Sequence, residues 1–426
     1  MPNLNTPKTP LDSSKCTTKQ HKAKTLRIVT FVFCEENYGQ ILQAYALQRS
    51  LRDNYPKFDT KVIWGVPQAF SKKLYYFHRI CGDSIYRFVR ACKKRVLGSS
   101  IQESQAELDM RKRRGFNEFK QAHIALHASR LQHYILPQKH RYPELSGDIF
   151  ITGSDQQWND WGTAPKESLQ GYAYSWLPYF TLEFAKLESI KIAYAASFGK
   201  RVFKNQAQKD YFKNVLTSFT AISTREQAGV TMLESIGIES TCVPDPTMLL
   251  DREHYCALID SATLNLPSNL SESIFIYTYG DSAFGGDLLP KILGKYANVV
   301  AVASTYNPSD TYNATIQEWL ACVKECKLMV TGSFHGTCFA IMMNTPFFLM
   351  RISHNESESL NTRFETLLEV FGLQDRMVSS LEELESKIKE NPPIDWGKVN
   401  ERLKAWRKVG QEFLAKELEP HHASIP

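Results

Sequence analysis

The stretch VTGSFHGTCFAIMMNTPFFLM, residues Val330–Met350, carries the pattern that decides the fold. An apolar strand ends at Ser333, an apolar helix follows, and a second apolar strand begins at Pro346. Two short apolar strands joined through a helix are typical of parallel α/β structure. A single histidine, His335, stands between the strand and the helix, with Gly336 beside it. It is either a buried histidine that hydrogen-bonds a loop or a functional imidazole.

The same alternation of strand and helix extends over most of the chain. Six strands are expected in a first unit: Leu26–Phe33, Thr60–Gly65, Asp148–Ser154, Ile190–Ser197, Ala221–Glu226 and Ser240–Pro246. Four are expected in a second unit: Ile274–Tyr279, Asn298–Ser304, Leu328–Ser333 and Pro346–Ile352. We predict an α/β protein with two Rossmann-like, doubly wound domains that face each other across a cleft.

Composition places boundaries on these units. We predict a disordered leader over residues 1–25, an N-terminal α/β domain over 26–252, a C-terminal α/β domain over 270–380 and a helical tail over 381–426. The leader is polar and lacks the apolar centre of a secretory signal. The link LNLPSNLSES is polar and rich in turn formers. No apolar run approaches the roughly 20 residues that span a bilayer.

The nine cysteines are scattered and odd in number. This pattern suits reduced thiols in a cytoplasmic protein rather than a disulfide framework. Cys322 and Cys326 are four residues apart, but no second pair at zinc spacing accompanies them. We therefore predict no metal site.

Positive charge is concentrated in one segment. The chain carries a net charge of +6, whereas residues 71–115 hold twelve Lys or Arg against four Asp or Glu. Aromatic residues alternate with these cations at nearly helical spacing, which predicts a basic helical insertion. It is either a solvated helical face or a peripheral contact with anionic headgroups at the inner face of a membrane. No nucleic-acid-binding motif accompanies the charge, so we expect no nucleic-acid partner.

Polar residues and glycines gather where the expected strands end, and they form the predicted site. They are Asn37, Tyr38 and Gly39, then Gly153, Ser154, Asp155 and Gln156, then Arg225 and Asp245, and in the second unit Ser333, His335 and Gly336. The carboxyl ends of parallel strands in two facing units line a shared cleft, where ligands of such folds bind. We expect these residues to meet there.

Each of these residues also has a structural explanation. Asp155 could cap a following helix, and Asp245 before a proline could form a turn. Arg225 could belong to a structural ion pair. Asn37-Tyr38-Gly39 is expected to be a tight turn, whose glycine lets the backbone approach a ligand. Their joint placement at one edge of two sheets favours a functional site over five independent coincidences.

Seven motifs, in this order, resemble those of the polysaccharide pyruvyl transferase family. They are NYGQILQAYALQ, ITGSDQQWN, AYAASFG, STREQAGV, VPDPTMLL, TGSFHGTCFAIMMNTPFF and NTRFETLLEVFGLQDR, and the resemblance covers about Leu26 to Arg376. It implies a fold similar to that of nucleotide-sugar glycosyltransferases, described as glycosyltransferase-B-like. It also implies transfer of the pyruvyl group of phosphoenolpyruvate onto two hydroxyls of a sugar. The product is a pyruvate ketal on a surface glycan or its lipid-linked precursor, and phosphate is released.

The resemblance assigns roles to individual residues. His335 is the catalytic candidate, since an imidazole suits the protonation of the phosphoenolpyruvate methylene. Arg225 is the donor-binding candidate, because a guanidinium and helix N-termini suit the two anionic groups of that donor. We predict Asp155 as the base for an attacking hydroxyl, and Asn37 and Gly39 on the acceptor side. The chemistry requires no cofactor beyond phosphoenolpyruvate as the donor substrate.

One position departs from the pattern of some family members, which carry an arginine two residues before the histidine. Here that residue is Ser333. Lys200, Arg201, Arg351 or helix amides could compensate for the missing charge, or the donor could differ. Two other functions stay open: a glycosyltransferase that uses a sugar nucleotide, and a catalytically silent glycan-binding protein of the same pathway.

Overall fold

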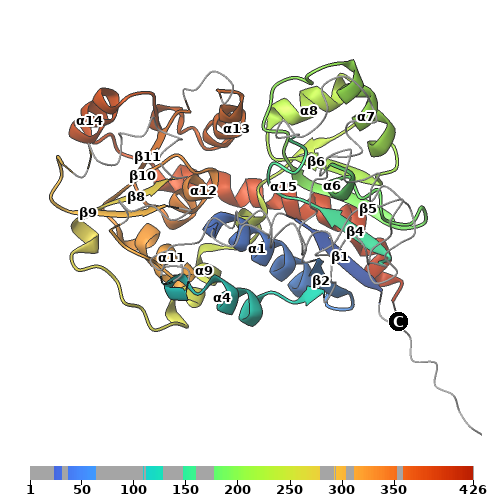
Figure 1. Ribbon diagram of the computed structural model, residues 1–426, viewed down its shortest axis with the longest axis horizontal. Helices are drawn as coiled ribbons and strands as arrows, with labels where there is room; N and C mark the ends of the chain where they lie inside the picture. The colour runs from blue at the N-terminus through green and yellow to red at the C-terminus, as the bar shows by residue number, and fades with distance from the viewer. Residues whose placement is uncertain are drawn as a thin grey trace, which may run out of the picture.

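The structure is a computed structural model that describes residues 24–30, 37–63, 109, 112–127, 147–159, 177–278, 292, 294–303, 311–352 and 358–425. It contains two parallel sheets with flanking helices, which confirms the predicted α/β class (Figure 1). The predicted disordered leader lies outside the described residues apart from its last two. The basic segment over residues 71–115 lies outside them apart from residues 109 and 112–115. In the part of the chain that is described, no helix has the length and apolar character needed to cross a membrane.

The first sheet has seven strands in the order β3-β2-β1-β4-β5-β6-β7. Every neighbouring pair is parallel. The strands are β1 Thr25–Val29, β2 Asp59–Ile63, β3 Leu126–His127, β4 Ile149–Thr152, β5 Ile190–Ala196, β6 Ala221–Thr224 and β7 Thr241–Cys242. The chain builds outward from β1 to β3 and then returns to β4 on the other side. This reversal between β1 and β4 is the switch point at which such sheets bind ligands.

The helices of the first unit are α1 Tyr38–Asn54, α4 Phe116–His123, α6 Leu177–Phe180, α7 Gln206–Leu216 and α8 Gln227–Glu234, with a 3-10 turn, η2, over Pro246–Leu249. Helix α9, Arg252–Asp260, follows and packs against α11, Ile316–Glu325, of the second unit. The expected tight turn at Asn37-Tyr38-Gly39 is wrong. Asn37 is instead the N-cap of α1, and its side chain accepts a hydrogen bond from the backbone amide of Gln40. Gly39 therefore lies in the first helical turn.

The second sheet has five parallel strands in the order β12-β11-β10-β8-β9. Its strands are β8 Ile274–Thr278, β9 Val299–Ala303, β10 Leu328–Thr331, β11 Phe347–Met350 and β12 Met377–Val378. The helices are α11 Ile316–Glu325, α12 Phe334–Met343, α13 Thr362–Phe371 and α14 Leu381–Glu390, with 3-10 turns η3 Leu270–Glu272, η5 Glu358–Asn361 and η6 Gln374–Arg376. The switch point of this sheet lies between β8 and β10.

The segment Val330–Met350 forms the end of β10, helix α12 and β11, as predicted. All ten residues of α12 are buried. A helix that is apolar all round must be covered on every side. The helix packs against its own sheet and also contacts α1 and η2 of the first unit. The N-terminus of α12, which carries His335, therefore lies between the two sheets.

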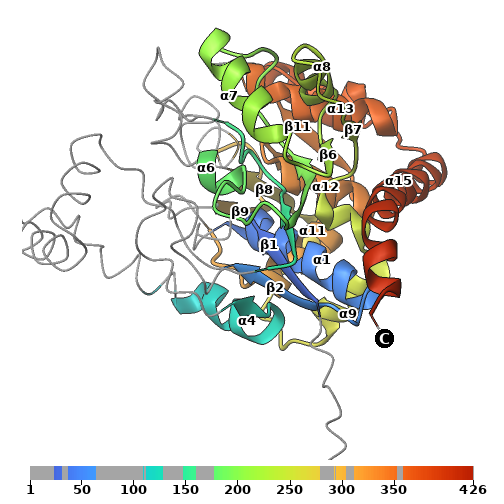
Figure 2. The ribbon, with the colours of Figure 1, turned by 90° about the vertical axis from the view of Figure 1, so that its right-hand side faces the viewer.

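Helix α15, Trp396–Ala423, returns from the second unit and runs along the first (Figures 1 and 2). It contacts α13 and α12 before it reaches η2. The guanidinium of Arg407 donates to the carbonyl oxygens of Met248 and Leu250 at 2.9 and 3.0 Å. Gly410 lets the helix approach closely, because a Cβ there would lie 2.5 Å from the hydroxyl oxygen of Tyr194. The helix thus ties the two units together on one side of the molecule.

Candidate functional site

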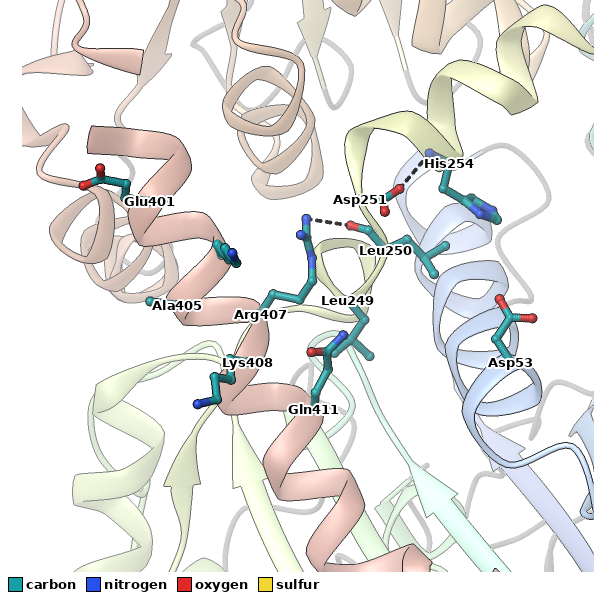
Figure 3. Close-up of a pocket in the computed structure, with 11 residues that line it drawn as sticks. Asp53, Leu249, Leu250, Asp251, His254, Glu401, Ala405, Arg407, Lys408 and Gln411 are labelled. Carbon is teal, nitrogen blue, oxygen red and sulfur yellow. Dashed lines mark hydrogen bonds between the residues drawn. The ribbon is translucent and has the colours of Figure 1, made fainter. Parts of the chain in front are cut away.

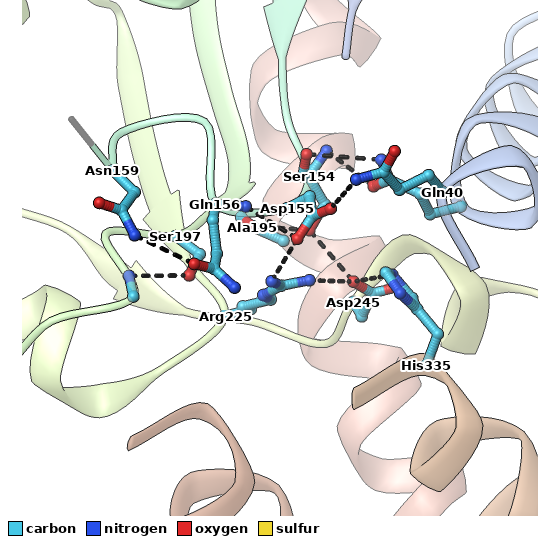
Figure 4. A network of polar contacts seen from close by, with 12 residues as sticks. Gln40, Ser154, Asp155, Gln156, Asn159, Ala195, Ser197, Arg225, Asp245 and His335 are labelled. Atoms are coloured by element: carbon cyan, nitrogen blue, oxygen red, sulfur yellow. Dashed lines mark hydrogen bonds and ion pairs between the residues drawn. The ribbon is translucent and has the colours of Figure 1, made fainter. Parts of the chain in front are cut away.

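The carboxyl ends of the two sheets meet at one buried polar network (Figure 4). Oδ2 of Asp245, which follows β7, lies 3.1 Å from Nη1 of Arg225 and 3.5 Å from Nε2 of His335. Arg225 follows β6 of the first sheet, whereas His335 follows β10 of the second. The structure therefore brings the predicted imidazole and guanidinium together on one carboxylate, from opposite halves of the chain.

The guanidinium of Arg225 is surrounded by carboxylates. Nη2 lies 2.7 Å from Oδ1 of Asp155, and Nε lies 3.9 Å from Oε2 of Glu226. Burial opposes the charge on Arg225, but the carboxylates of Asp155, Asp245 and Glu226 outweigh burial and raise its pKa above the ordinary value. The ring of Phe334 covers the guanidinium carbon at 4.4 Å. Arg225 is thus a buried side chain that stays positively charged.

Asp245 is fixed by donors on both of its oxygens. Oδ1 accepts hydrogen bonds from the amide and the hydroxyl of Thr247. Oδ2 accepts one from the hydroxyl of Ser154 at 3.1 Å and faces Arg225 and His335. Burial opposes ionisation of Asp245, but the nearby charges of His335 and Arg225 hold its pKa well below the usual range. The expected turn role of Asp245 is also present, since it caps η2.

Asp155 does not cap a helix, because no helix follows it among residues 156–159. Its backbone is left-handed, with φ 85°, and it bridges to Ala196 of β5. Its carboxylate accepts hydrogen bonds from Arg225, from the side-chain amide of Gln40 at 2.8 Å and from the backbone amide of Gln156 at 2.9 Å. Burial opposes its ionisation, but Arg225 and the charges around it outweigh burial and lower its pKa. An ionised carboxylate with this many donors is a weak proton acceptor.

Two glycines admit these close approaches. A Cβ on Gly39 would lie 2.4 Å from Cγ and Nδ1 of His335, so the backbone of α1 packs directly against the imidazole. Gly153 has φ 136°, and a Cβ there would lie 1.8 Å from the carbonyl oxygen of Tyr194. Only glycine fits either position without displacing its neighbour.

Other predicted residues hold the elements around the network, and Gln156 also joins it through the backbone amide that bonds Asp155. Asn37 and Ser333 are the N-caps of α1 and α12. The backbone amide of Gly336 donates to the hydroxyl of Ser333 at 3.2 Å. The side-chain carbonyl of Gln156 accepts a hydrogen bond from the side-chain amide of Asn159. Tyr38 is fully buried between the two units, where its ring stacks on Trp319 and its hydroxyl donates to the carbonyl of Ala314. The structure therefore places Tyr38 in the core rather than beside His335.

Sequence reasoning assigned no role to four residues of the site: Gln40, Glu226, Phe334 and Arg363. Glu226 is fully buried, and burial raises its pKa against the opposing charge of Arg225. Arg363 is buried at the start of α13, and its charge acts on both Asp155 and Glu226. All four lie inside the motifs that carry the family resemblance, and membership of those motifs could have indicated that they belong to the site.

Two cations that could replace the missing family arginine lie around one carboxylate. Nη2 of Arg201 is 2.5 Å from one oxygen of Glu365, and Nη2 of Arg351 is 3.7 Å from the other. Arg201 follows β5 of the first sheet and Glu365 lies on α13, so their contact joins the two units. The backbone amide of Gln227 donates to the hydroxyl of Thr366 on the same helix.

A separate hollow of about 830 Å³ lies beside α15, η2 and the C-terminal end of α1 (Figure 3). Its walls carry charges of both signs, among them Asp53, Asp251, Lys404 and Lys408. None of the predicted site residues lines it. The convergence of groups that can transfer protons and bind anions is at His335, and we place the candidate site there. Among the residues that the structure describes, no group of three or more His, Cys, Asp or Glu side chains is arranged to hold a metal ion.

Comparison with known proteins assigns the chain to a family. The sequence profile of the family described as "Polysaccharide pyruvyl transferase" matches residues 37–354, a range that contains Asp155, Arg225, Asp245 and His335. The chain belongs to the polysaccharide pyruvyl transferase family. The family is one of transferases in polysaccharide biosynthesis, which confirms the resemblance noted from the motifs. No curated protein sequence shows significant similarity to this chain.

Matches among solved structures include proteins named as UDP-N-acetylglucosamine 2-epimerases and a glycotransferase. UDP-N-acetylglucosamine 2-epimerase from Rickettsia bellii is 9% identical, with a TM-score of 0.45 over 95% of this chain and 99% of that chain. The glycotransferase of kitacinnamycin is 12% identical, with a TM-score of 0.43 over 95% and 100% of the two chains. The Methanocaldococcus jannaschii UDP-GlcNAc 2-epimerase in complex with UDP-GlcNAc and UDP is 12% identical, with a TM-score of 0.42 over 89% and 98%.

Proposed function

We propose that this protein transfers the pyruvyl unit of phosphoenolpyruvate onto two hydroxyls of a sugar in a surface glycan or its lipid-linked precursor. The products are a cyclic pyruvate ketal and phosphate. One observation carries the proposal: Asp245 joins an imidazole from the second sheet to a guanidinium from the first. This arrangement supplies the proton donor and the fixed positive charge that the reaction of an anionic enol phosphate requires.

His335 is suited to carry every proton in this reaction. As an imidazolium it protonates the methylene carbon of phosphoenolpyruvate, which leaves an oxocarbenium-like centre on the adjacent carbon. The first sugar hydroxyl attacks that centre, and its proton passes to the imidazole. The proton is then given to the bridging oxygen of the phosphate as the carbon–oxygen bond breaks. The second hydroxyl attacks, and its proton restores the imidazolium, so that one hydroxyl proton ends on the new methyl group and the other on phosphate.

Asp245 stabilises the cationic form of His335 through the reaction, because its carboxylate lies 3.5 Å from Nε2 and stays ionised. The donors from Thr247 and Ser154 hold this carboxylate in place. Such preorganised partners lower the barrier because they need no rearrangement when charge develops. Asp245 is therefore a positioning residue for His335 in this proposal.

Arg225 is suited to bind the donor through the one nitrogen that the protein leaves without a hydrogen bond. Nη1 and Nη2 are bonded to Asp245 and Asp155, whereas Nε is buried and has no hydrogen-bond partner. A carboxylate or phosphate oxygen of phosphoenolpyruvate would accept a charge-assisted bond from Nε. The first-turn amides of α12 add a site of positive potential for the same anion.

The sequence predicts Asp155 as the base for an attacking hydroxyl, whereas this proposal gives it a positioning role. Its bonds to Arg225 and Gln40 and its lowered pKa suit it to hold those two side chains in place. In the proton sequence above, His335 accepts both hydroxyl protons, so no second base is needed. His335, Arg225, Asp245 and Asp155 are all under one-tenth exposed, so the surrounding structure must move to admit a saccharide.

The proposal is tested by incubating the protein with a saccharide panel and either phosphoenolpyruvate or nucleotide sugars. Release of inorganic phosphate from phosphoenolpyruvate, dependent on the saccharide, supports pyruvyl transfer. Release of a nucleoside diphosphate from a nucleotide sugar, with no phosphate from phosphoenolpyruvate, would assign the protein to glycosyl transfer instead.

A further inference from the structure

We infer that Gln40 binds the saccharide acceptor through its side-chain carbonyl and thereby separates the acceptor side of the site from the donor side. The inference rests on the proposed function and assigns a residue to recognition of one of the two substrates. Gln40 lies in the first turn of α1, next to Gly39, whose backbone packs against the imidazole of His335. A hydroxyl held by Gln40 is therefore held beside the proton carrier.

The orientation of the Gln40 amide follows from its neighbour. Nε2 lies 2.8 Å from Oδ2 of Asp155, whose lowered pKa keeps it an ionised acceptor. Only the NH₂ group can satisfy an ionised carboxylate, so the carbonyl oxygen Oε1 must point away from it. Oε1 is buried and has no hydrogen-bond partner in the protein. An acceptor atom beside the reacting groups is thus reserved for a ligand that donates.

The polarity of this free atom distinguishes the two substrates. Phosphoenolpyruvate presents carboxylate and phosphate oxygens, which accept hydrogen bonds, whereas a saccharide presents hydroxyls, which donate. Oε1 of Gln40 can therefore pair with the saccharide and not with the anionic oxygens of the donor. Arg225 shows the opposite case, because its Nε, which has no hydrogen-bond partner and lies 3.9 Å from Oε2 of Glu226, is a donor. In this proposal, Oε1 of Gln40 assigns the sugar to the α1 side and Nε of Arg225 assigns phosphoenolpyruvate to its own side.

Gln43 provides a matched control one helical turn further along α1. Its Oε1 accepts from the backbone amide of Ser154 at 3.1 Å, and its Nε2 donates to the hydroxyl of Thr30 at 2.8 Å. Both ends of this amide are used by the protein, so it has no atom reserved for a ligand. Methionine has a side chain of nearly the same length as glutamine but lacks the amide, so each substitution removes the same group.

The experiment compares the wild type with Gln40→Met and Gln43→Met. Phosphate release is measured with p-nitrophenyl glycosides of galactose, glucose, mannose and N-acetylglucosamine, varying the glycoside and phosphoenolpyruvate in turn. We expect Gln40→Met to raise the KM for the glycoside by about three- to tenfold relative to the KM for phosphoenolpyruvate. Gln43→Met is expected to lower the melting temperature and leave the ratio of the two KM values unchanged.

An equal rise of both KM values in Gln40→Met, or a rise for phosphoenolpyruvate alone, overturns the inference. If Gln40→Met does not fold, Gln40→Asn is used instead, because it shortens the side chain by one carbon and moves the amide away. The measured quantity is again the KM for the glycoside relative to the KM for phosphoenolpyruvate. If the wild type releases no phosphate with any glycoside, the proposed function fails. Calorimetric titration with the same glycosides then judges Gln40 separately: binding that weakens in Gln40→Met and not in Gln43→Met supports it. Equal binding in both variants, or no binding by the wild type, overturns it.

Discussion

Nε2 of His335 lies 3.5 Å from Oδ2 of Asp245, although the two residues follow strands of different sheets. The same oxygen also pairs with the guanidinium of Arg225 and accepts a hydrogen bond from the hydroxyl of Ser154. A single carboxylate therefore contacts groups from both units at the point where they meet. The proposed chemistry depends on this junction, and substitutions around it have separable consequences.

Asp245→Asn should lower turnover far more than it raises either KM. The amide has nearly the same shape but no charge, so the imidazolium of His335 loses the partner that stabilises it. We expect kcat to fall by about two decades or more, the usual size of an effect on acid–base catalysis. Steady-state phosphate release measures this.

Thr247→Val is the control for Asp245→Asn, because it removes the hydroxyl bonded to Oδ1 and leaves Oδ2 untouched. It should cost about 1 kcal/mol of unfolding free energy and change kcat much less than Asp245→Asn does. Similar losses of kcat in both variants would show that the carboxylate acts through general stability rather than through His335.

Asp155 and Asp245 predict that the stability of the protein is sensitive to acid. The pKa values of Asp155 and Asp245 are lowered from the ordinary 3.8, so below about pH 4 the unfolded chain binds protons that the folded chain does not. The free energy of unfolding should therefore fall as the pH drops below 4. Glu226, whose pKa is raised from 4.5, acts with the opposite sign and above that window.

Urea denaturation between pH 5 and pH 2.5 measures this dependence. Asp245→Asn should give a shallower loss of stability below pH 4 than the wild type, because one of the two depressed carboxyls is gone. At neutral pH the variant should be less stable by about 3 kcal/mol, because a buried charge pair is broken. Parallel curves for the two proteins would contradict the burial of an ionised Asp245.

Gly39→Ala should lower turnover by displacing the imidazole of His335. The added Cβ would lie 2.4 Å from atoms of His335, although alanine itself favours the helix. Overpacking of this kind costs about 1–3 kcal/mol, and we expect kcat to fall at least tenfold while the protein stays folded. Phosphate release and circular dichroism measure the two effects.

Gly237→Ala is the comparison for Gly39→Ala. Gly237 has φ 76° after α8, and a Cβ there would meet no atom within 4 Å. It should lower the free energy of unfolding by about 1 kcal/mol through backbone strain and leave kcat unchanged. Unaltered kcat in Gly39→Ala would mean that α1 does not press on His335.

Gly410→Ala should reverse the usual effect of this substitution in a helix. Replacing glycine by alanine inside a helix normally stabilises by about 0.5–1 kcal/mol. At Gly410 the new Cβ would lie 2.5 Å from the hydroxyl oxygen of Tyr194 and 2.7 Å from Pro244, so α15 would be pushed away from the first unit. We expect a net loss of about 1–3 kcal/mol in urea denaturation. A stabilised variant would show that α15 does not pack as closely as described.

The strands and the meeting of their carboxyl ends were predictable from the sequence. Buried parallel strands are continuous apolar runs, and Val330–Met350 shows two of them around an apolar helix. The two-residue strands β3 and β12 carry too few residues for any pattern, and they form because a neighbouring strand pairs with them. The strand expected over Ser240–Pro246 is limited to β7 because Asp245-Pro246 opens η2.

The local geometry of the site was less accessible. Asn37-Tyr38-Gly39 has the composition of a turn, but its glycine is required by contact with His335, a residue almost 300 positions away. Asp155 has the pattern of a cap, yet tertiary bonds with Arg225 and Gln40 hold it in a left-handed conformation. Gln40 is one of several polar residues on α1, and only the structure shows that its carbonyl lacks a partner.

The most direct test of the account is phosphate release from phosphoenolpyruvate by the wild type and by His335→Gln, each with the glycoside panel. Glutamine keeps much of the volume of the imidazole but cannot carry protons near neutral pH. We predict glycoside-dependent release by the wild type and a rate lower by about two to four decades in His335→Gln, with folding retained. Equal rates for the two proteins would contradict the role of His335 as the proton carrier.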